Sequence, residues 1–125
     1  MSDSMLCDTC VLIDFLKGRD QQLANFYQQN VLLFINPVIE LELLQGARNK
    51  AELQQLEKKL QMFRLLDMPQ ENFQLARELI KLYALSHGLR LADALIAASA
   101  MIYDLRLWTV NVNDFKYISG LVLYP

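Results

Sequence analysis

Four acidic residues stand where hydrophobic segments of this chain end or are interrupted. They are Asp8, Glu42, Asp93 and Asp114. A carboxylate is costly to bury unless it is paired, hydrogen-bonded or bound to a cation. Four such residues, spread along the whole chain, predict a single acidic pocket in which their charges meet.

A pocket of this kind would have a definite chemistry. Two unit charges about 4 Å apart repel by about 4 kcal/mol at an effective dielectric constant near 20. A divalent cation with oxygen ligands relieves that repulsion, and with 1 His and 2 Cys in the chain Mg²⁺ or Mn²⁺ is expected rather than zinc. One or two such ions could activate water against a phosphodiester. The four acids therefore indicate a metal-dependent nuclease.

Each acid also has an ordinary explanation when it is taken singly. Asp8 could cap a helix, and Asp93 could satisfy free N–H groups in a first helical turn. Asp114 could be a turn residue, and Glu42 could pair with an arginine. On its expected helix Glu42 faces apolar neighbours, whereas Glu40 faces solvent.

Short hydrophobic runs alternate with amphipathic segments. Strands are expected at 4–7, 31–35, 63–67, 105–110 and 121–124, and helices at 10–17, 20–29, 36–48, 50–62, 69–87, 91–103 and 113–118. This alternation predicts one α/β domain over 1–125, a three-layer α/β/α fold with a mainly parallel central sheet of about four to five strands. Ligands of such sheets bind beyond the carboxyl ends of the strands, and Asp8 and Asp114 both follow expected strands.

Composition sets the remaining limits. The chain is 54% hydrophobic with a net charge of -2, which fits either a leucine-rich core or an apolar surface left for a partner. No apolar run has the roughly 20 residues of a membrane span, and the N-terminus lacks the basic segment of a signal peptide. We expect a cytoplasmic protein. The net charge does not exclude a phosphate-bearing substrate, because a metal ion would neutralise the acids.

Cys7 and Cys10 form a CxxC at an expected strand-to-helix junction, where thioredoxin-like proteins carry their redox pair. A thiol–disulfide oxidoreductase is therefore an alternative function. It needs an exposed cysteine of low pKa, whereas the apolar run before Asp8 predicts a buried Cys7.

Four motifs occur in order along the chain. They are Asp8-Thr9-Cys10-Val11-Leu12-Ile13-Asp14, Glu42-Leu43-Leu44-Gln45-Gly46, Asp93-Ala94-Leu95-Ile96-Ala97-Ala98 and Thr109-Val110-Asn111-Val112-Asn113-Asp114-Phe115. Together they resemble the PIN-domain ribonucleases, especially the VapC-type toxin of VapBC toxin–antitoxin pairs, over essentially the full length. Cys10 stands where Ser or Asn is commoner, so a weaker hydrogen bond is expected from that position. Ile39 stands where Thr is usual, so the supporting contact near Glu42 is not expected.

By that resemblance, the four acids are catalytic and bind Mg²⁺ or Mn²⁺, with Thr9 and Asn111 as supporting residues. The resemblance also implies hydrolysis of RNA, with tRNA or rRNA the expected substrate. It implies a homodimer inhibited by a VapB-type antitoxin, whose C-terminal segment occupies an apolar groove. The alternative within the same fold is a non-catalytic PIN-like module that binds RNA or protein.

Overall fold

A computed structural model of the chain describes residues 4–125. Its strands are β1 (Ser4–Cys7), β2 (Leu32–Ile35), β3 (Arg64–Leu65), β4 (Arg106–Trp108) and β5 (Leu123–Tyr124). They form one sheet in the order β3-β2-β1-β4-β5, and each neighbouring pair is parallel. The expected mainly parallel sheet is confirmed.

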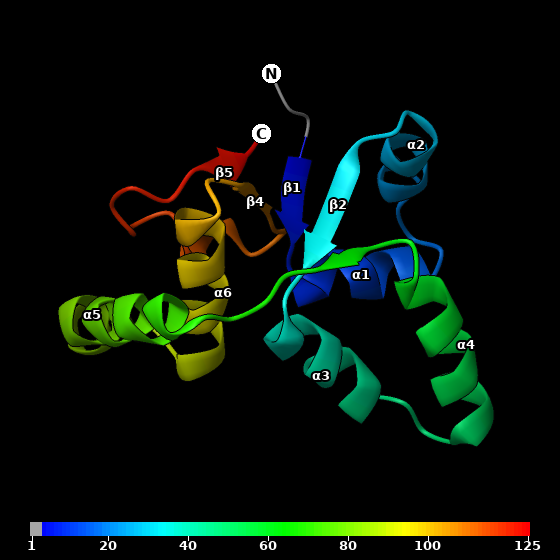
Figure 1. Cartoon of the computed structure of the whole chain (residues 1–125), viewed down its shortest axis with the longest axis horizontal. Coiled ribbons are helices and arrows are strands. Elements are labelled where there is room, and N and C mark those ends of the chain that lie inside the picture. The colour runs from blue at the N-terminus through cyan, green and yellow to red at the C-terminus, as the bar shows by residue number, and fades with distance from the viewer. Residues whose placement is uncertain (1–3) are drawn as a thin grey trace.

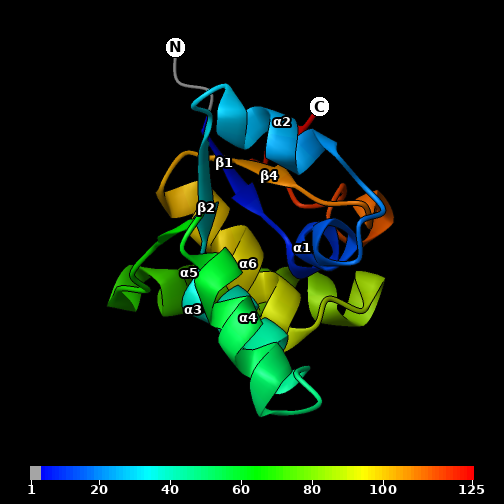
Figure 2. The same ribbon diagram turned by 90° about the vertical axis from the view of Figure 1, so that its right-hand side faces the viewer.

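Helices cover both faces of this sheet. They are α1 (Thr9–Leu16), α2 (Gln22–Gln28), α3 (Pro37–Gln45), α4 (Lys50–Leu60), α5 (Gln70–His87) and α6 (Leu91–Ile102), with a short 3-10 helix, η1 (Val112–Asp114). The helices α1 and α2 lie on one side of the sheet, and α5 and α6 lie on the other (Figure 2). Beyond the arrowheads of β1 and β2 lies α3 (Figure 1). The three-layer α/β/α fold is therefore confirmed.

Capping residues fix several of these boundaries. The Asn36 side chain accepts a hydrogen bond of 2.9 Å from the Ile39 N–H, with Pro37 in the first turn, so α3 begins directly after β2. At the C-terminal end of α5, Gly88 adopts a left-handed conformation with φ 71°. Glycine takes this conformation without strain, so the chain leaves the helix after His87.

Two helices are shorter than their sequence predicts. The expected end of α3 near Arg48 is wrong: α3 ends at Gln45, because Gly46 caps it and Asn49 caps the following helix. The helix expected over 113–118 is also wrong, because only η1 forms there. Turns follow η1 and bury Phe115 and Ile118, which are 1% and 3% exposed.

A buried polar network joins three helices of the core. The Asn36 amide donates to Ser99 Oγ at 2.9 Å, and Ser99 Oγ donates to Asn72 Oδ1 at 2.6 Å. The Asn72 amide in turn donates to the Leu95 carbonyl at 3.1 Å. Because Asn36, Asn72 and Ser99 are all 0% exposed, these bonds fix how α3, α5 and α6 pack.

No helix in residues 4–125 has both the length and the apolar character needed to cross a membrane.

Ser99→Ala should destabilise the fold by about 1 to 3 kcal/mol, since it leaves the buried amides of Asn36 and Asn72 without their shared partner. Denaturant unfolding would measure the change. Ser119→Ala is the control, because Ser119 is exposed and bonds through its backbone N–H; its effect should stay within about 0.5 kcal/mol. Equal stability of the two variants would contradict a structural role for the network.

Candidate active site

Asp8 is the buried anchor of the acidic cluster. It follows β1, caps α1 and is 5% exposed. Its Oδ1 accepts the Thr9 N–H at 2.8 Å, and its Oδ2 accepts the Thr109 hydroxyl at 2.8 Å and the Cys10 thiol at 3.3 Å. These donors stabilise a carboxylate that burial would otherwise penalise.

Thr109 reaches Asp8 through the pairing of β1 with β4. Cys7 lies opposite Trp108 in the parallel register, so the residues that follow the two strands meet at the same edge of the sheet. Thr109 was not among the site residues predicted from the sequence. Its position directly after an apolar strand was the available signal. The backbone N–H of Asn111, a predicted supporting residue, donates to Thr109 Oγ1 at 3.0 Å.

Glu42 joins the cluster through Thr9, whose hydroxyl donates to Glu42 Oε1 at 2.7 Å. The expected directions of Glu40 and Glu42 are wrong: Glu42 is exposed and Glu40 is half-buried. The buried stripe of α3 is formed by Ile39 and Leu43, four residues apart, and Glu42 lies outside it. The carboxylate is therefore accessible at the site.

Asp93 lies in the first turn of α6 and interacts electrostatically with the other three acids. Its pKa is raised from 3.8 to about 6, first by burial and then by repulsion from Asp8, Asp114 and Glu42. Arg90 opposes the shift. The same pattern reaches Tyr117, whose pKa is raised by burial and then by the charges of Asp93 and Asp114. The fold has thus brought the four predicted acids into one electrostatic neighbourhood.

The acids do not form a ready-made metal site. Within residues 4–125, no group of three or more His, Cys, Asp or Glu side chains is placed so that it could hold a metal ion. The donor chemistry nevertheless fits a hard divalent cation, because all four groups are carboxylates whose mutual repulsion raises the pKa of Asp93. Binding one ion would require these side chains to turn towards one another.

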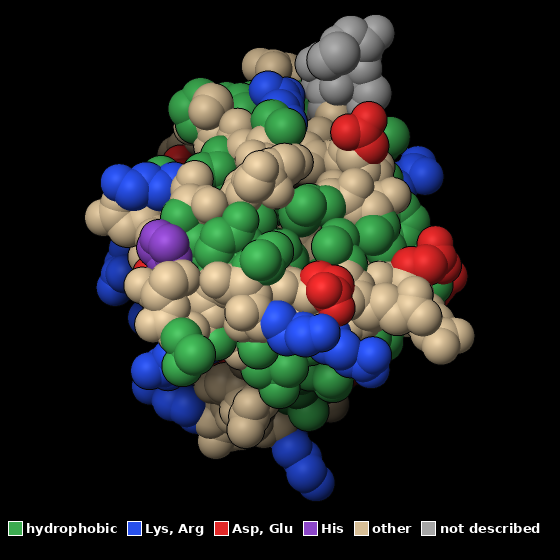
Figure 3. Space-filling model, turned by 90° about the vertical axis from the view of Figure 1, so that its left-hand side faces the viewer, with side chains coloured by type: hydrophobic (Ala, Val, Ile, Leu, Met, Phe, Trp, Pro, Cys, Tyr) green, Lys and Arg blue, Asp and Glu red, His purple; other side chains and the backbone are tan. Residues whose placement is uncertain are grey.

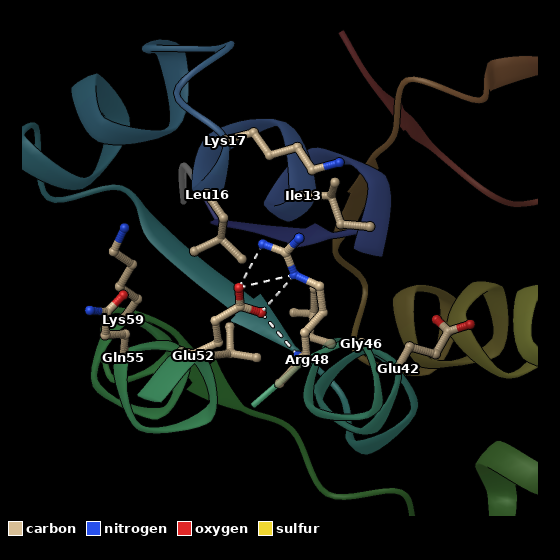
Figure 4. A pocket seen from close by; sticks show the side chains of 12 residues that line it. Ile13, Leu16, Lys17, Glu42, Gly46, Arg48, Glu52, Gln55 and Lys59 are labelled. Carbon is tan, nitrogen blue, oxygen red and sulfur yellow. Dashed lines mark hydrogen bonds and ion pairs between the residues drawn. The ribbon is translucent and has the colours of Figure 1, made fainter. Parts of the chain in front are cut away.

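Two cavities flank the cluster. The larger, of about 570 Å³, lies between α1, α3 and α4 and has Glu42 at one end. Figure 4 shows Ile13 and Leu16 over this groove, with Arg48 and Glu52 paired across it at 2.7 Å. The smaller cavity, of about 360 Å³, is lined by His87, Gly88, Leu89, Arg90, Asp93, Asp114 and Tyr117.

The two cysteines do not form a reactive pair. Cys7 is 0% exposed, as expected, and burial raises the pKa of its thiol well above the usual range. Burial also raises the pKa of Cys10. The thiol–disulfide alternative is not supported, because a nucleophilic cysteine needs an accessible thiolate. Cys10 instead contacts Asp8 and Thr109, while Ile39, 0% exposed, is a core residue.

Known proteins provide an independent comparison. A family model described as the PIN domain matches residues 5–121. A toxin–antitoxin complex from Klebsiella pneumoniae contains a chain with 28% identity and a TM-score of 0.77; the match covers 94% of this chain and 95% of that one. No curated protein sequence matches the chain.

Other solved structures are more distant in sequence. VapBC-1 from nontypeable Haemophilus influenzae has 21% identity and a TM-score of 0.83, over 97% of this chain and 96% of that one. DNA-bound VapBC from Salmonella typhimurium has 20% identity and a TM-score of 0.81, over 99% of this chain and 98% of that one. At these identities the two similarities establish the fold alone.

Thr109→Val and Thr9→Val form a matched test of the hydrogen bonds. Thr109→Val should destabilise the protein by about 1 to 3 kcal/mol, because it removes a donor from the buried Asp8 carboxylate. Thr9→Val removes only an exposed bond to Glu42, and its effect should stay within about 0.5 kcal/mol. Urea denaturation of the metal-free protein would measure the free energy of unfolding of both variants. A smaller loss of stability in Thr109→Val than in Thr9→Val would contradict the role of the Thr109 hydroxyl in stabilising Asp8.

Asp93→Asn should be as stable as the wild type near pH 4 and relatively more stable near pH 7. In the wild type the raised pKa means that stability present below about 3.8 is lost as the pH rises through about 6. Asparagine has no charge to develop, so it escapes that loss. Unfolding at several pH values in EDTA would measure the difference, with Asp67→Asn, an exposed carboxylate, as control. A pH-independent difference would refute the coupling.

Proposed function

This chain belongs to the PIN-domain family, and from that membership we propose that it is a metal-dependent endoribonuclease, the VapC-type toxin of a type II toxin–antitoxin pair. The observation that carries the proposal is how the four acids meet. Thr9 donates to both Asp8 and Glu42, and Asp93 and Asp114 line one cavity. The charges of the other three acids also raise the pKa of Asp93. Like charges are rarely gathered in this way without a functional reason. A fold needs no such cluster for its own stability.

We assign the four carboxylates as the ligands and charge-bearing groups of a Mg²⁺ or Mn²⁺ site. When bound, such an ion would supply an activated water and neutralise charge on a phosphodiester. The protein's own contribution is orientation. The Thr109 hydroxyl and the Thr9 N–H hold the two oxygens of Asp8, and the Thr9 hydroxyl holds Glu42. Asp93 and Asp114 supply the remaining negative charge.

RNA is the proposed substrate, with tRNA or rRNA as the class to test first. The chain has no net positive charge to attract nucleic acid in general. Binding would therefore depend on the neutralised acidic site and on local contacts beside it.

A VapB-type antitoxin is the proposed partner. The support is the likeness to a chain of a toxin–antitoxin complex, at 28% identity over 94% of this chain. The groove between α1, α3 and α4 is the proposed place for its C-terminal segment, because it offers both apolar and charged side chains to a peptide and Glu42 lies at its end. A peptide in this groove would cover an acid of the site.

A homodimer is the proposed assembly. Exposed leucines support it, namely Leu82, Leu85 and Leu91, which are 64%, 103% and 69% exposed. Figure 3 shows a band of hydrophobic side chains on the face of the molecule that carries α5. Contiguous apolar surface of this kind is typical of interfaces.

The purified protein should cut bulk bacterial tRNA or rRNA into discrete fragments with Mn²⁺ or Mg²⁺, and EDTA should stop the reaction. Asp8→Asn, Asp93→Asn or Glu42→Gln should lower the rate at least about 100-fold, the range for losing a group that stabilises transition-state charge. Gel electrophoresis of labelled RNA would measure the rates.

Glu40→Gln is the matched control for Glu42→Gln, because the two glutamates lie on the same helix and only Glu42 bonds to Thr9. Its rate should equal that of the wild type. Cleavage that persists in Asp93→Asn would disprove the site assignment. Metal binding without cleavage of any RNA would instead favour the non-catalytic binding module.

A further inference from the structure

An ordered aromatic surface lies beside the acids, in the smaller cavity. His87 stacks on Tyr117 with ring centroids 4.2 Å apart and an angle of 10° between the planes. Tyr83 packs edge-on against both rings, at 5.8 Å from His87 and 5.2 Å from Tyr117. Ser86 Oγ lies 2.8 Å from His87 Nδ1. Contacts with Tyr117, Tyr83 and Ser86 therefore fix the orientation of the imidazole ring.

This ring is nevertheless at the surface. His87 is the last residue of α5 and is exposed. Figure 3 shows the single histidine of the chain at the molecular surface, at the edge of the hydrophobic band. An exposed side chain normally keeps its rotamer freedom. A ring that is fixed and accessible is suited to receive another flat ring.

The charges around this ring suit a nucleotide. His87 and Tyr117 line one cavity with Arg90, Asp93 and Asp114. Arg90 is exposed, directly precedes α6 and interacts electrostatically with Asp93. Arginine binds phosphate through its planar group of N–H donors. One cavity thus combines an aromatic face, a phosphate-binding cation and two of the proposed catalytic acids.

We propose that His87, backed by Tyr117, is the stacking platform for an unpaired base of the RNA substrate, with Arg90 contacting the adjoining phosphate. The inference rests on the proposed ribonuclease function and adds a substrate-binding residue to it: His87, which receives a base that is unpaired next to the cut bond. Bases in a duplex already stack on one another, so only an unpaired base can cover the imidazole. Stacking of this kind tolerates any base and gives affinity rather than sequence recognition.

The test separates binding from cleavage. Fluorescein-labelled ten-nucleotide single-stranded RNAs of mixed sequence would be bound with Ca²⁺ in place of Mg²⁺ or Mn²⁺, so that a divalent cation neutralises the acids. Binding would be followed by anisotropy, and a gel would check that the RNA stays uncut. His87→Ala and His87→Gln should weaken binding about 5- to 150-fold, the range for loss of one base–aromatic stack. His87→Phe should bind within about twofold of the wild type, because phenylalanine keeps a flat ring. Arg90→Ala should weaken binding and reduce its dependence on salt.

Gln74→Ala, on an exposed part of the same helix, is the control and should bind as the wild type does. Thermal unfolding of each variant shows whether it is folded. Because His87→Phe preserves the stack, it keeps the test decisive if His87→Ala proves unstable. Unchanged binding in both His87→Ala and His87→Gln, equal weakening in His87→Phe, or absence of single-stranded RNA binding by the wild type would each overturn the proposal.

Cleavage assays with Mn²⁺ distinguish this failure from failure of the proposed function. If the wild type cuts tRNA, His87→Ala should raise KM by the same 5- to 150-fold and leave kcat within about twofold, as expected for lost ground-state contact. An unchanged KM would reject the stacking role while the nuclease stands. If the wild type cuts nothing, the nuclease proposal fails, and the anisotropy series still decides whether His87 stacks on RNA.

Discussion

The parallel pairing of β1 with β4 is the contact on which the site depends. It places the ends of two strands side by side, with Cys7 opposite Trp108. The next residues, Asp8 and Thr109, then meet at 2.8 Å although they are 101 positions apart in the chain. If this pairing shifted by one residue, Asp8 would lose the hydrogen bond from Thr109, and the side chains of the shifted strand would change faces.

Repulsion among the four carboxylates is the second constraint, and it destabilises the folded state. The pKa of Asp93 is raised to about 6 by burial and by its three acidic neighbours. The protein limits the repulsion in two ways. Hydrogen bonds hold Asp8 below the surface, while Glu42 and Asp114 remain exposed to water. The cluster is thus tolerated without being neutralised, which leaves it able to attract a cation.

The surroundings of the acids divide into two regions of different chemistry. On the Glu42 side lies a groove lined by both apolar and charged side chains, including the Arg48–Glu52 ion pair, and suited to a peptide chain. On the Asp93 side lies the smaller cavity with its aromatic rings and Arg90, suited to a nucleotide. An inhibitor and a substrate could therefore approach the same acids from different directions. Cys10 belongs to neither region, since its thiol bonds within the Asp8–Thr109 network.

Local signals in the sequence determined the elements and the identity of the acids. Apolar runs, the Asn36 cap before Pro37 and the Gly88 stop act over a few residues, so they could be recognised without coordinates. Tertiary structure alone decided how the acids meet, which hydroxyl holds Asp8, and that Glu42 rather than Glu40 faces water. It also decided that His87 stacks on Tyr117. The physical reason is that parallel strand pairing and helix packing join residues far apart in the chain. A pattern over a few neighbouring residues does not specify which distant residue will be in contact with them.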